Sequence, residues 1–188
     1  MKRAVVVAAV LVAGTVRPAA ADEEREADDG GYWTLSAVGG VLVPIGDMKA
    51  THQAGLLAGG RVGWTSRIGL GVEVGGLYSP LPRTPSDEKE MRNHYAVATV
   101  GPRYTYGHGR WRGTAVLDGG VAVERTRFDA GGASDVDRHL APVVGGSARL
   151  EVYLSSNSGL VASLDFTQEL GGDPRHHLDL LGGLVLSY

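Results

Sequence analysis

Residues 178–188 read LDLLGGLVLSY, and the pattern in this stretch recurs along most of the chain. Every second residue from Leu178 to Tyr188 is apolar or glycine, whereas the positions between them include Asp179 and Ser187. Successive side chains of a β-strand point to opposite faces of the sheet, so a period of two predicts a strand with one apolar face. This stretch therefore predicts a strand that faces a nonpolar environment on one side.

Seven further runs with the same period precede this one, and no long stretch after residue 30 follows the 3.6-residue period of a helix. The eight expected strands are Tyr32–Val43, Ala54–Thr65, Arg67–Tyr78, His94–Tyr106, Trp111–Phe128, Leu140–Leu154, Gly159–Leu170 and Leu178–Tyr188. Pro102 and Pro142 cannot donate a backbone hydrogen bond, so each predicts a bulge, a strand end or a misplaced boundary.

The connections between these runs alternate in length. Long connections are expected at 44–53, 79–93 and 129–139, short ones around Ser66 and at 107–110 and 155–158, and a moderate one at 171–177. This rhythm is typical of an antiparallel up-and-down barrel with tight turns at one end and longer loops at the other. Because the number of strands is even, the first and last strands can pair and leave no exposed edge.

Alternation alone does not say which face of the barrel points outward, because a soluble barrel such as a lipocalin has an apolar interior. The sequence favours the inverted arrangement, since Lys49 and Lys89 are the only lysines after residue 21 and both fall in expected loops. Aromatic residues also gather near the ends of the runs, as they do at the two interfaces of membrane barrels. The expected interface residues are Trp33, Trp64, Tyr78, Trp111, Phe128, Phe166 and Tyr188. The fold class predicted is an all-β, eight-stranded transmembrane barrel.

The first thirty residues have a different character. Residues 1–21 resemble a secretory signal peptide, with Lys2 and Arg3 before an apolar stretch and a run of alanines at the expected cleavage site. Residues 22–30, DEEREADDG, form a short acidic segment that we expect to be flexible. The barrel domain is then expected at 31–188. The formal net charge of -3 and the absence of cysteine argue against a nucleic-acid partner, a disulfide framework and a cysteine-ligated metal.

With its leader, its eight alternating runs and its final aromatic residue, the chain resembles the small outer-membrane β-barrels of the OmpA/OmpX type. The last strand ends with Tyr188, which Leu186, Leu184, Gly182 and Leu180 precede on the same face. This arrangement resembles the C-terminal signal read by the barrel-assembly machinery. The resemblance implies a Gram-negative outer-membrane location, contact with outer-membrane lipid and assembly by that machinery. It covers the barrel alone, and no peptidoglycan-binding domain is expected.

Charged residues on the polar faces of the runs are expected inside the barrel. They are Arg61, Glu73, Arg103, Asp118, Arg149, Glu151, Asp165 and Asp179. Arginine can bind carboxylates through paired hydrogen bonds, so we expect these groups to form a charge network that fills the lumen. The alternative is a narrow ion path, which would favour cations because acidic groups are in excess.

The remaining polar residues do not predict a catalytic or metal site. His52, His94, His139, His176 and His177 are expected in loops or near the rim at the loop end, without the spacing of a metal site. No serine lies in a nucleophile motif such as Gly-x-Ser-x-Gly, so no enzyme activity, catalytic residue or cofactor is expected. The sequence predicts a structural or surface-interaction role through the extracellular loops, with an unidentified external partner. A small channel or transporter and a soluble periplasmic barrel that binds a lipophilic ligand are the alternatives.

Overall fold

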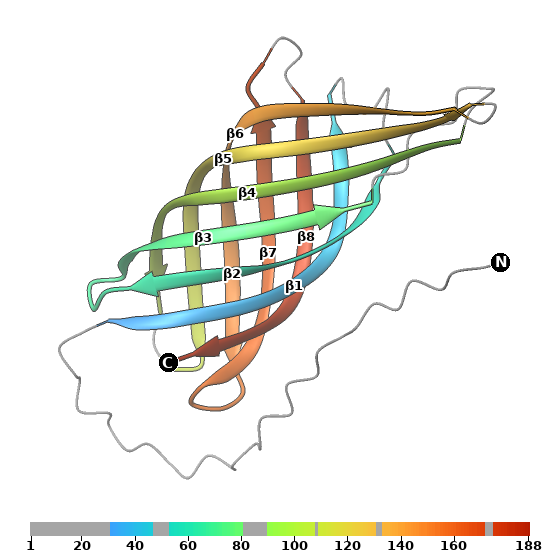
Figure 1. Cartoon of the computed structure of the whole chain (residues 1–188). Helices are drawn as coiled ribbons and strands as arrows, with labels where there is room; N and C mark the ends of the chain where they lie inside the picture. Colours follow the sequence, from blue (N-terminus) through green and yellow to red (C-terminus); the bar gives the residue numbers. More distant parts are fainter. Residues whose placement is uncertain (1–30, 47–52, 81–89, 108, 131–132, 172–174) are drawn as a thin grey trace.

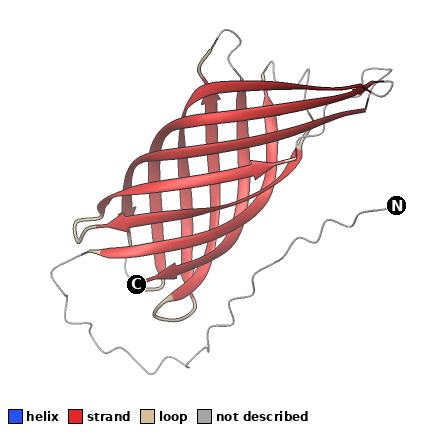
Figure 2. Cartoon of the chain, viewed as in Figure 1, coloured by secondary structure: helices blue, strands red, loops and turns tan. Residues whose placement is uncertain are grey.

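The computed structural model describes residues 31–46, 53–80, 90–107, 109–130, 133–171 and 175–188, with backbone only for 90–92, 127–130 and 133–135. Within these residues every regular element is a strand (Figure 2), and none is a helix long and apolar enough to cross a membrane. The predicted signal peptide, the acidic segment at 22–30 and His52 lie outside the described residues. The strands are β1 (Tyr32–Ile45), β2 (Gly55–Thr65), β3 (Leu70–Ser79), β4 (Glu90–Tyr106), β5 (Trp111–Ala130), β6 (Ala133–Tyr153), β7 (Ser158–Glu169) and β8 (His176–Ser187).

The eight strands form one closed antiparallel barrel in which each strand pairs with its neighbours in sequence and β8 pairs with β1 (Figure 1). Both predictions, all-β class and eight-stranded closure, are confirmed. The strands are staggered: the pairing line that starts at Leu35 runs through Val62 and returns to β1 at Ile45, ten residues further along. Stagger and strand number together fix the width of a barrel, and eight strands enclose an interior that side chains fill.

The two ends of the barrel differ in their connections. At one end, here called the turn end, four-residue turns at 66–69 and 154–157 join neighbouring strands, and four residues separate the end of β4 at Tyr106 from the start of β5 at Trp111. Tyr188 exchanges backbone hydrogen bonds of 3.0 Å with Trp33 at the same end. In the first of these turns Gly69 has a φ of +85°, which glycine adopts without strain. The other end, here called the loop end, holds the β1–β2, β3–β4, β5–β6 and β7–β8 connections. The predicted alternation of connections is therefore present at three of the four loop-end positions.

The exception is the β5–β6 connection, for which the prediction of a long loop at 129–139 is wrong. These residues continue the strands instead, with Thr126 paired to Asp137 and Ala130 paired to Ala133. β4 also begins earlier than expected, at Glu90, and pairs with β5 along this extension. The result is a three-stranded projection beyond the rest of the barrel, made of residues 90–94, 124–130 and 133–141 and here called the loop-end sheet (Figure 1).

The two strand prolines mark places where pairing is interrupted. The β6–β7 ladder begins at Val143, directly after Pro142, so the part of β6 before this proline pairs with β5 alone. Pro102 pairs with Val72 of β3 but is absent from the β4–β5 ladder, as expected of a residue without an N–H. β3 also starts later than predicted, at Leu70, because residues 66–69 form the preceding turn.

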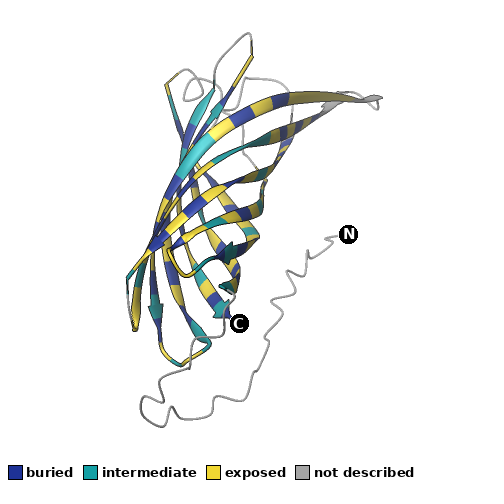
Figure 3. Ribbon diagram, turned by 90° about the vertical axis from the view of Figure 1, so that its left-hand side faces the viewer, coloured by how far each residue is buried: buried dark blue, intermediate teal, exposed yellow. Residues whose placement is uncertain are grey.

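Burial alternates along the strands up to the loop-end sheet, as the blue and yellow bands of Figure 3 show, whereas residues 136–140 of β6 are all exposed. The apolar face points outward: Leu56, Ile68 and Leu117 are each at least 70% exposed. The polar face points into the lumen, where Arg103 is 2% and Asp179 is 1% exposed. The polarity is thus inverted relative to a soluble barrel, as the sequence predicts.

Candidate functional sites in the lumen and on the outer wall

The centre of the lumen holds an arginine–carboxylate cluster built from four strands. Arg149 of β6 binds both carboxylate oxygens of Glu73 on β3, one of them at 2.5 Å, and its Nη2 also donates to Ser147 at 3.0 Å. Arg103 of β4 lies 3.6 Å from Glu73 and 3.8 Å from Glu151, and its Nη1 donates to Thr34 at 2.6 Å. Buried charges are tolerated when each is paired and hydrogen-bonded, as these are.

A second pair adjoins this cluster, because β2 lies beside β3 and β7 lies beside β6. Arg61 of β2 donates to Asp165 of β7 and also to Ser163, at 3.3 Å. The other two predicted members pair differently. Asp118 is half-buried and forms no arginine salt bridge among the described residues, and its Oδ1 lies beside Gly145. Oδ2 of Asp179 lies 3.5 Å from Nε2 of His177, and Asp179 forms no arginine salt bridge among the described residues.

An apolar layer lies on the loop-end side of this cluster. Leu57, Val97 and Val143 are each at most 6% exposed, and they lie four to six residues nearer the loop end than the arginines of their own strands. Leu42 is fully buried in the same cluster, and Leu77 packs against it. Packed aliphatic side chains, here called the apolar collar, therefore line the lumen between the arginine–carboxylate cluster and the loop end.

Beyond the apolar collar lies a second polar cluster, whose acids Glu124 and Glu169 were not among the charges expected in the lumen. Glu124 accepts a hydrogen bond from Asn93 at 2.7 Å and pairs with Arg175. Glu169 lies 4.0 Å from the exposed His139. His177, expected in a loop or at the rim, is instead fully buried with its ring edge-on to Tyr95. The period-two pattern could have predicted that the two acids face inward. Glu124 lies on the same face of β5 as Asp118, and Glu169 lies on the same face of β7 as Asp165.

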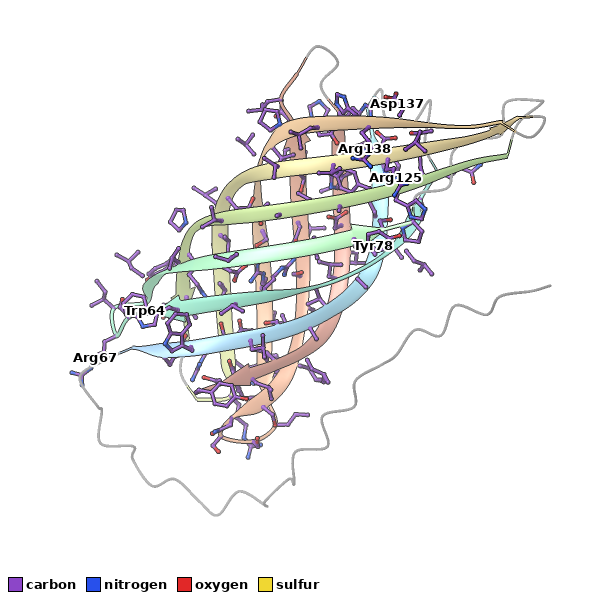
Figure 4. The ribbon with its side chains drawn as sticks, viewed as in Figure 1. Trp64, Arg67, Tyr78, Arg125, Asp137 and Arg138 are labelled. Carbon is purple, nitrogen blue, oxygen red and sulfur yellow. The ribbon has the colours of Figure 1, made fainter. Side chains whose placement is uncertain are left out.

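The predicted interface aromatics lie at the two ends of the outer wall. At the turn end Trp33, Trp111 and Tyr188 are 55–65% exposed and Trp64 is half-buried. Toward the loop end Tyr78 and Phe166 are 47% and 40% exposed, whereas the Phe128 side chain lies outside the described part. Figure 4 shows Trp64 and Tyr78 at opposite ends of the neighbouring strands β2 and β3.

Among the strand side chains that the structure describes, outward-facing charges return on the loop-end sheet. Arg125 and Arg138 are exposed, directly opposite each other on β5 and β6, and lie side by side in Figure 4. Neither forms an ion pair with any described side chain. Like charges at opposed positions of a sheet repel. Beside them, the hydroxyl of Tyr78 lies 2.5 Å from Nδ1 of His94.

The histidines and acids of the described residues do not assemble into a group of three that would hold a metal ion. His94, His139, His176 and His177 are instead distributed over the outer wall, the rim and the lumen.

No protein-family model matches the sequence, and no curated protein does. Solved structures do match. Neisserial surface protein A is similar with a TM-score of 0.57 at 11% identity, over 84% of this chain and 97% of that one. The attachment invasion locus protein Ail of Yersinia pestis is similar with a TM-score of 0.55 at 15% identity, over 85% and 99%. The N-terminal β-barrel domain of Pseudomonas aeruginosa OprF gives 0.54 at 14%, over 85% and 98%. The chain thus has the fold of the small eight-stranded outer-membrane β-barrels of the OmpA/OmpX type.

Proposed function

We propose that this chain is a non-enzymatic outer-membrane barrel that is exported after cleavage near residue 21 and displays its loop-end sheet outside the cell. The inverted polarity carries the proposal. Between the two aromatic ends the outward positions are apolar or small, whereas the lumen holds the paired charges. An apolar wall of this kind is compatible with the hydrocarbon core of a bilayer. Because the barrel is closed, no unpaired strand edge is exposed to the lipid chains. A soluble lipophile-binding barrel would require the opposite polarity.

Two leucines on neighbouring strands test this assignment. Leu117 and Leu140 are 70% and 69% exposed, but Leu117 lies within the apolar wall and Leu140 on the loop-end sheet. An arginine facing lipid at mid-depth costs about 2–4 kcal/mol and much less outside the bilayer. We expect Leu117→Arg to lower the free energy of unfolding in phospholipid vesicles by that amount and Leu140→Arg to leave it nearly unchanged. Equal losses would contradict a lipid-facing wall.

The surface role is proposed for the loop-end sheet, and its unpaired arginines favour an anionic partner. Arg125 and Arg138 present two guanidinium groups on one face, a geometry that binds phosphate or sulfate oxygens through charge-assisted hydrogen bonds. Ail, which shares the fold, has been solved with the heparin analogue sucrose octasulfate. We propose polyanion binding at this face.

Calorimetry with sucrose octasulfate tests the surface role. The double variant Arg125→Gln/Arg138→Gln should weaken binding about tenfold or more, since two charge-assisted contacts are lost. Arg110→Gln removes one arginine from an exposed position at the turn end and should bind like the wild type, whereas Arg125→Gln removes the same charge from the loop-end sheet and should already weaken binding. Equal losses in these two single variants would show that net charge, rather than the arginine pair, governs binding.

A further inference from the structure

Two neighbouring cavities differ in the chemistry of their linings, one at the turn end and one that runs from there along the outer wall as far as Phe166 and Leu178. The first, here called the rim pocket, has a volume of about 380 Å³ and lies between the β2–β3 and β4–β5 turns. It is polar, and its lining includes Tyr32, Arg67, Tyr104 and Arg112. An opening with two arginines among its lining residues favours an anionic group.

Arg112 is the residue that points most directly to a ligand. Its guanidinium lies 4.5 Å from the ring centroids of both Tyr32 and Tyr153, so two cation–π contacts hold it in place. Its Nη1 is buried and donates no hydrogen bond. Glu151, opposite it on β6, instead accepts from Tyr153 at 2.9 Å and faces Arg103. Within the described residues the Arg112 charge therefore has a fixed position and no carboxylate partner.

The second cavity, here called the lateral groove, has a volume of about 520 Å³ and lies on the outer wall. The register explains it. Tyr104, Ala115, Ala148 and Leu164 are consecutive partners across β4, β5, β6 and β7. Two alanines thus lie between larger side chains and leave a depression in an otherwise bulky wall. Its lining is almost wholly apolar, and its size is typical of small-molecule sites.

Tyr104 lines both cavities, so the polar rim pocket and the apolar lateral groove adjoin. We infer that together they bind one glycerophospholipid of the periplasmic leaflet, with its phosphate at Arg112 and an acyl chain along Ala115 and Ala148. The inference rests on the proposed membrane orientation, which puts the turn end at the periplasmic surface. It concerns the opposite end of the barrel from the proposed surface role and is independent of it.

Native mass spectrometry of the refolded full-length barrel in detergent tests this site with dioleoylphosphatidylglycerol and with dioleoylglycerol, which has the same chains and no phosphate. We expect the wild type to retain one phosphatidylglycerol with a preference of about tenfold over the neutral lipid, the usual scale of a charged hydrogen bond. Arg112→Gln should abolish this preference. Arg110→Gln, in the adjoining turn but outside the pocket lining, should keep it.

Variants that fill the lateral groove with a larger side chain test whether this groove binds an acyl chain. Ala115→Phe should reduce retention of both lipids by about tenfold, whereas Ala37→Phe, on the exposed face of β1, should not. If Ala115→Phe fails to fold, Ala148→Phe fills the same groove from β6. Equal retention by the groove-filling variant and Ala37→Phe, or an unchanged phosphate preference in Arg112→Gln, would overturn the inference. A barrel that reaches the outer-membrane fraction and retains no lipid would refute this site alone, whereas one absent from that fraction would refute the proposed function.

Discussion

Two adjacent glycines of β8 show how tightly the seam between the first and last strands packs. A Cβ atom on Gly183 would lie 2.0 Å from the carbonyl oxygen of Ala37 in β1, a distance that backbone atoms cannot relieve without moving apart. A Cβ on Gly182 would meet nothing nearer than 3.9 Å. The close approach of β1 and β8 therefore requires a glycine at position 183, which faces inward. It does not require one at position 182, which faces outward.

Substitution of these glycines separates the two roles. Gly183→Ala should lower the free energy of unfolding by about 1–3 kcal/mol, the usual cost of overpacking, because β1 must shift away from β8. Gly182→Ala should change it by only a few tenths of a kcal/mol, since its Cβ points into open space. Urea titrations in phospholipid vesicles, followed by tryptophan fluorescence, measure both. Similar stability of the two variants would mean that the seam is loose.

At the same scale, the sequence predicts which charges face inward but not how they pair. Period-two alternation suffices to place Arg149 and Glu73 inside the barrel. Their contact joins residues 76 positions apart and depends on the register of four strands, which no local pattern encodes. His177 was missed because its strand begins two residues earlier than the apolar pattern does.

The strands β5 and β6 extend beyond the residues that show the period-two pattern of a strand. The residues expected as a loop are polar, and Val136, Asp137 and Arg138 are all exposed. A strand outside the bilayer needs no apolar face, because water satisfies both surfaces, so the alternation that reveals a lipid-facing strand is absent there. The hairpin is held instead by continuous backbone pairing from Trp111 to Ala130.

Because this hairpin pairs with nothing beyond Pro142 on the β7 side, it should be separable from the barrel. Replacement of residues 126–137 by Asn-Gly would join Arg125 to Arg138, which are already opposite, through a two-residue turn. We expect this variant to fold and to retain a heat-dependent shift in gel mobility. Loss of the shift would show that the loop-end sheet is required for barrel assembly.

At the scale of the whole molecule, the strand count was predictable from the number of alternating runs, but the ten-residue stagger was not. Stagger follows from how all eight strands meet, and it determines which inward side chains share a level. This stagger places the apolar collar on the loop-end side of the arginine–carboxylate ion pairs. The sequence suggested a charge network that fills the lumen and left an ion path as the alternative, and the collar favours the filled lumen.

A planar-bilayer recording tests the closed lumen. The apolar collar offers ions no polar ligands, so we expect no stepwise current above the leak of the protein-free bilayer. The heat-dependent mobility shift of the same preparation verifies that the barrel is folded. Stepwise cation-selective conductance would mean that the collar opens and that the acidic excess of the lumen selects the permeating ion.

The pairing of β1 with β8 also has a kinetic consequence. Thr34 meets Ser187, so the contact that completes the barrel joins nearly the two extremes of the described chain. Contacts of large sequence separation form slowly, because the entropy of closing the intervening chain is lost before the contact compensates for it. Until β1 meets β8, any partly paired sheet keeps two bare edges, and such edges invite pairing between chains. The time for which the folding chain is prone to aggregation is therefore expected to depend on this single long-range encounter.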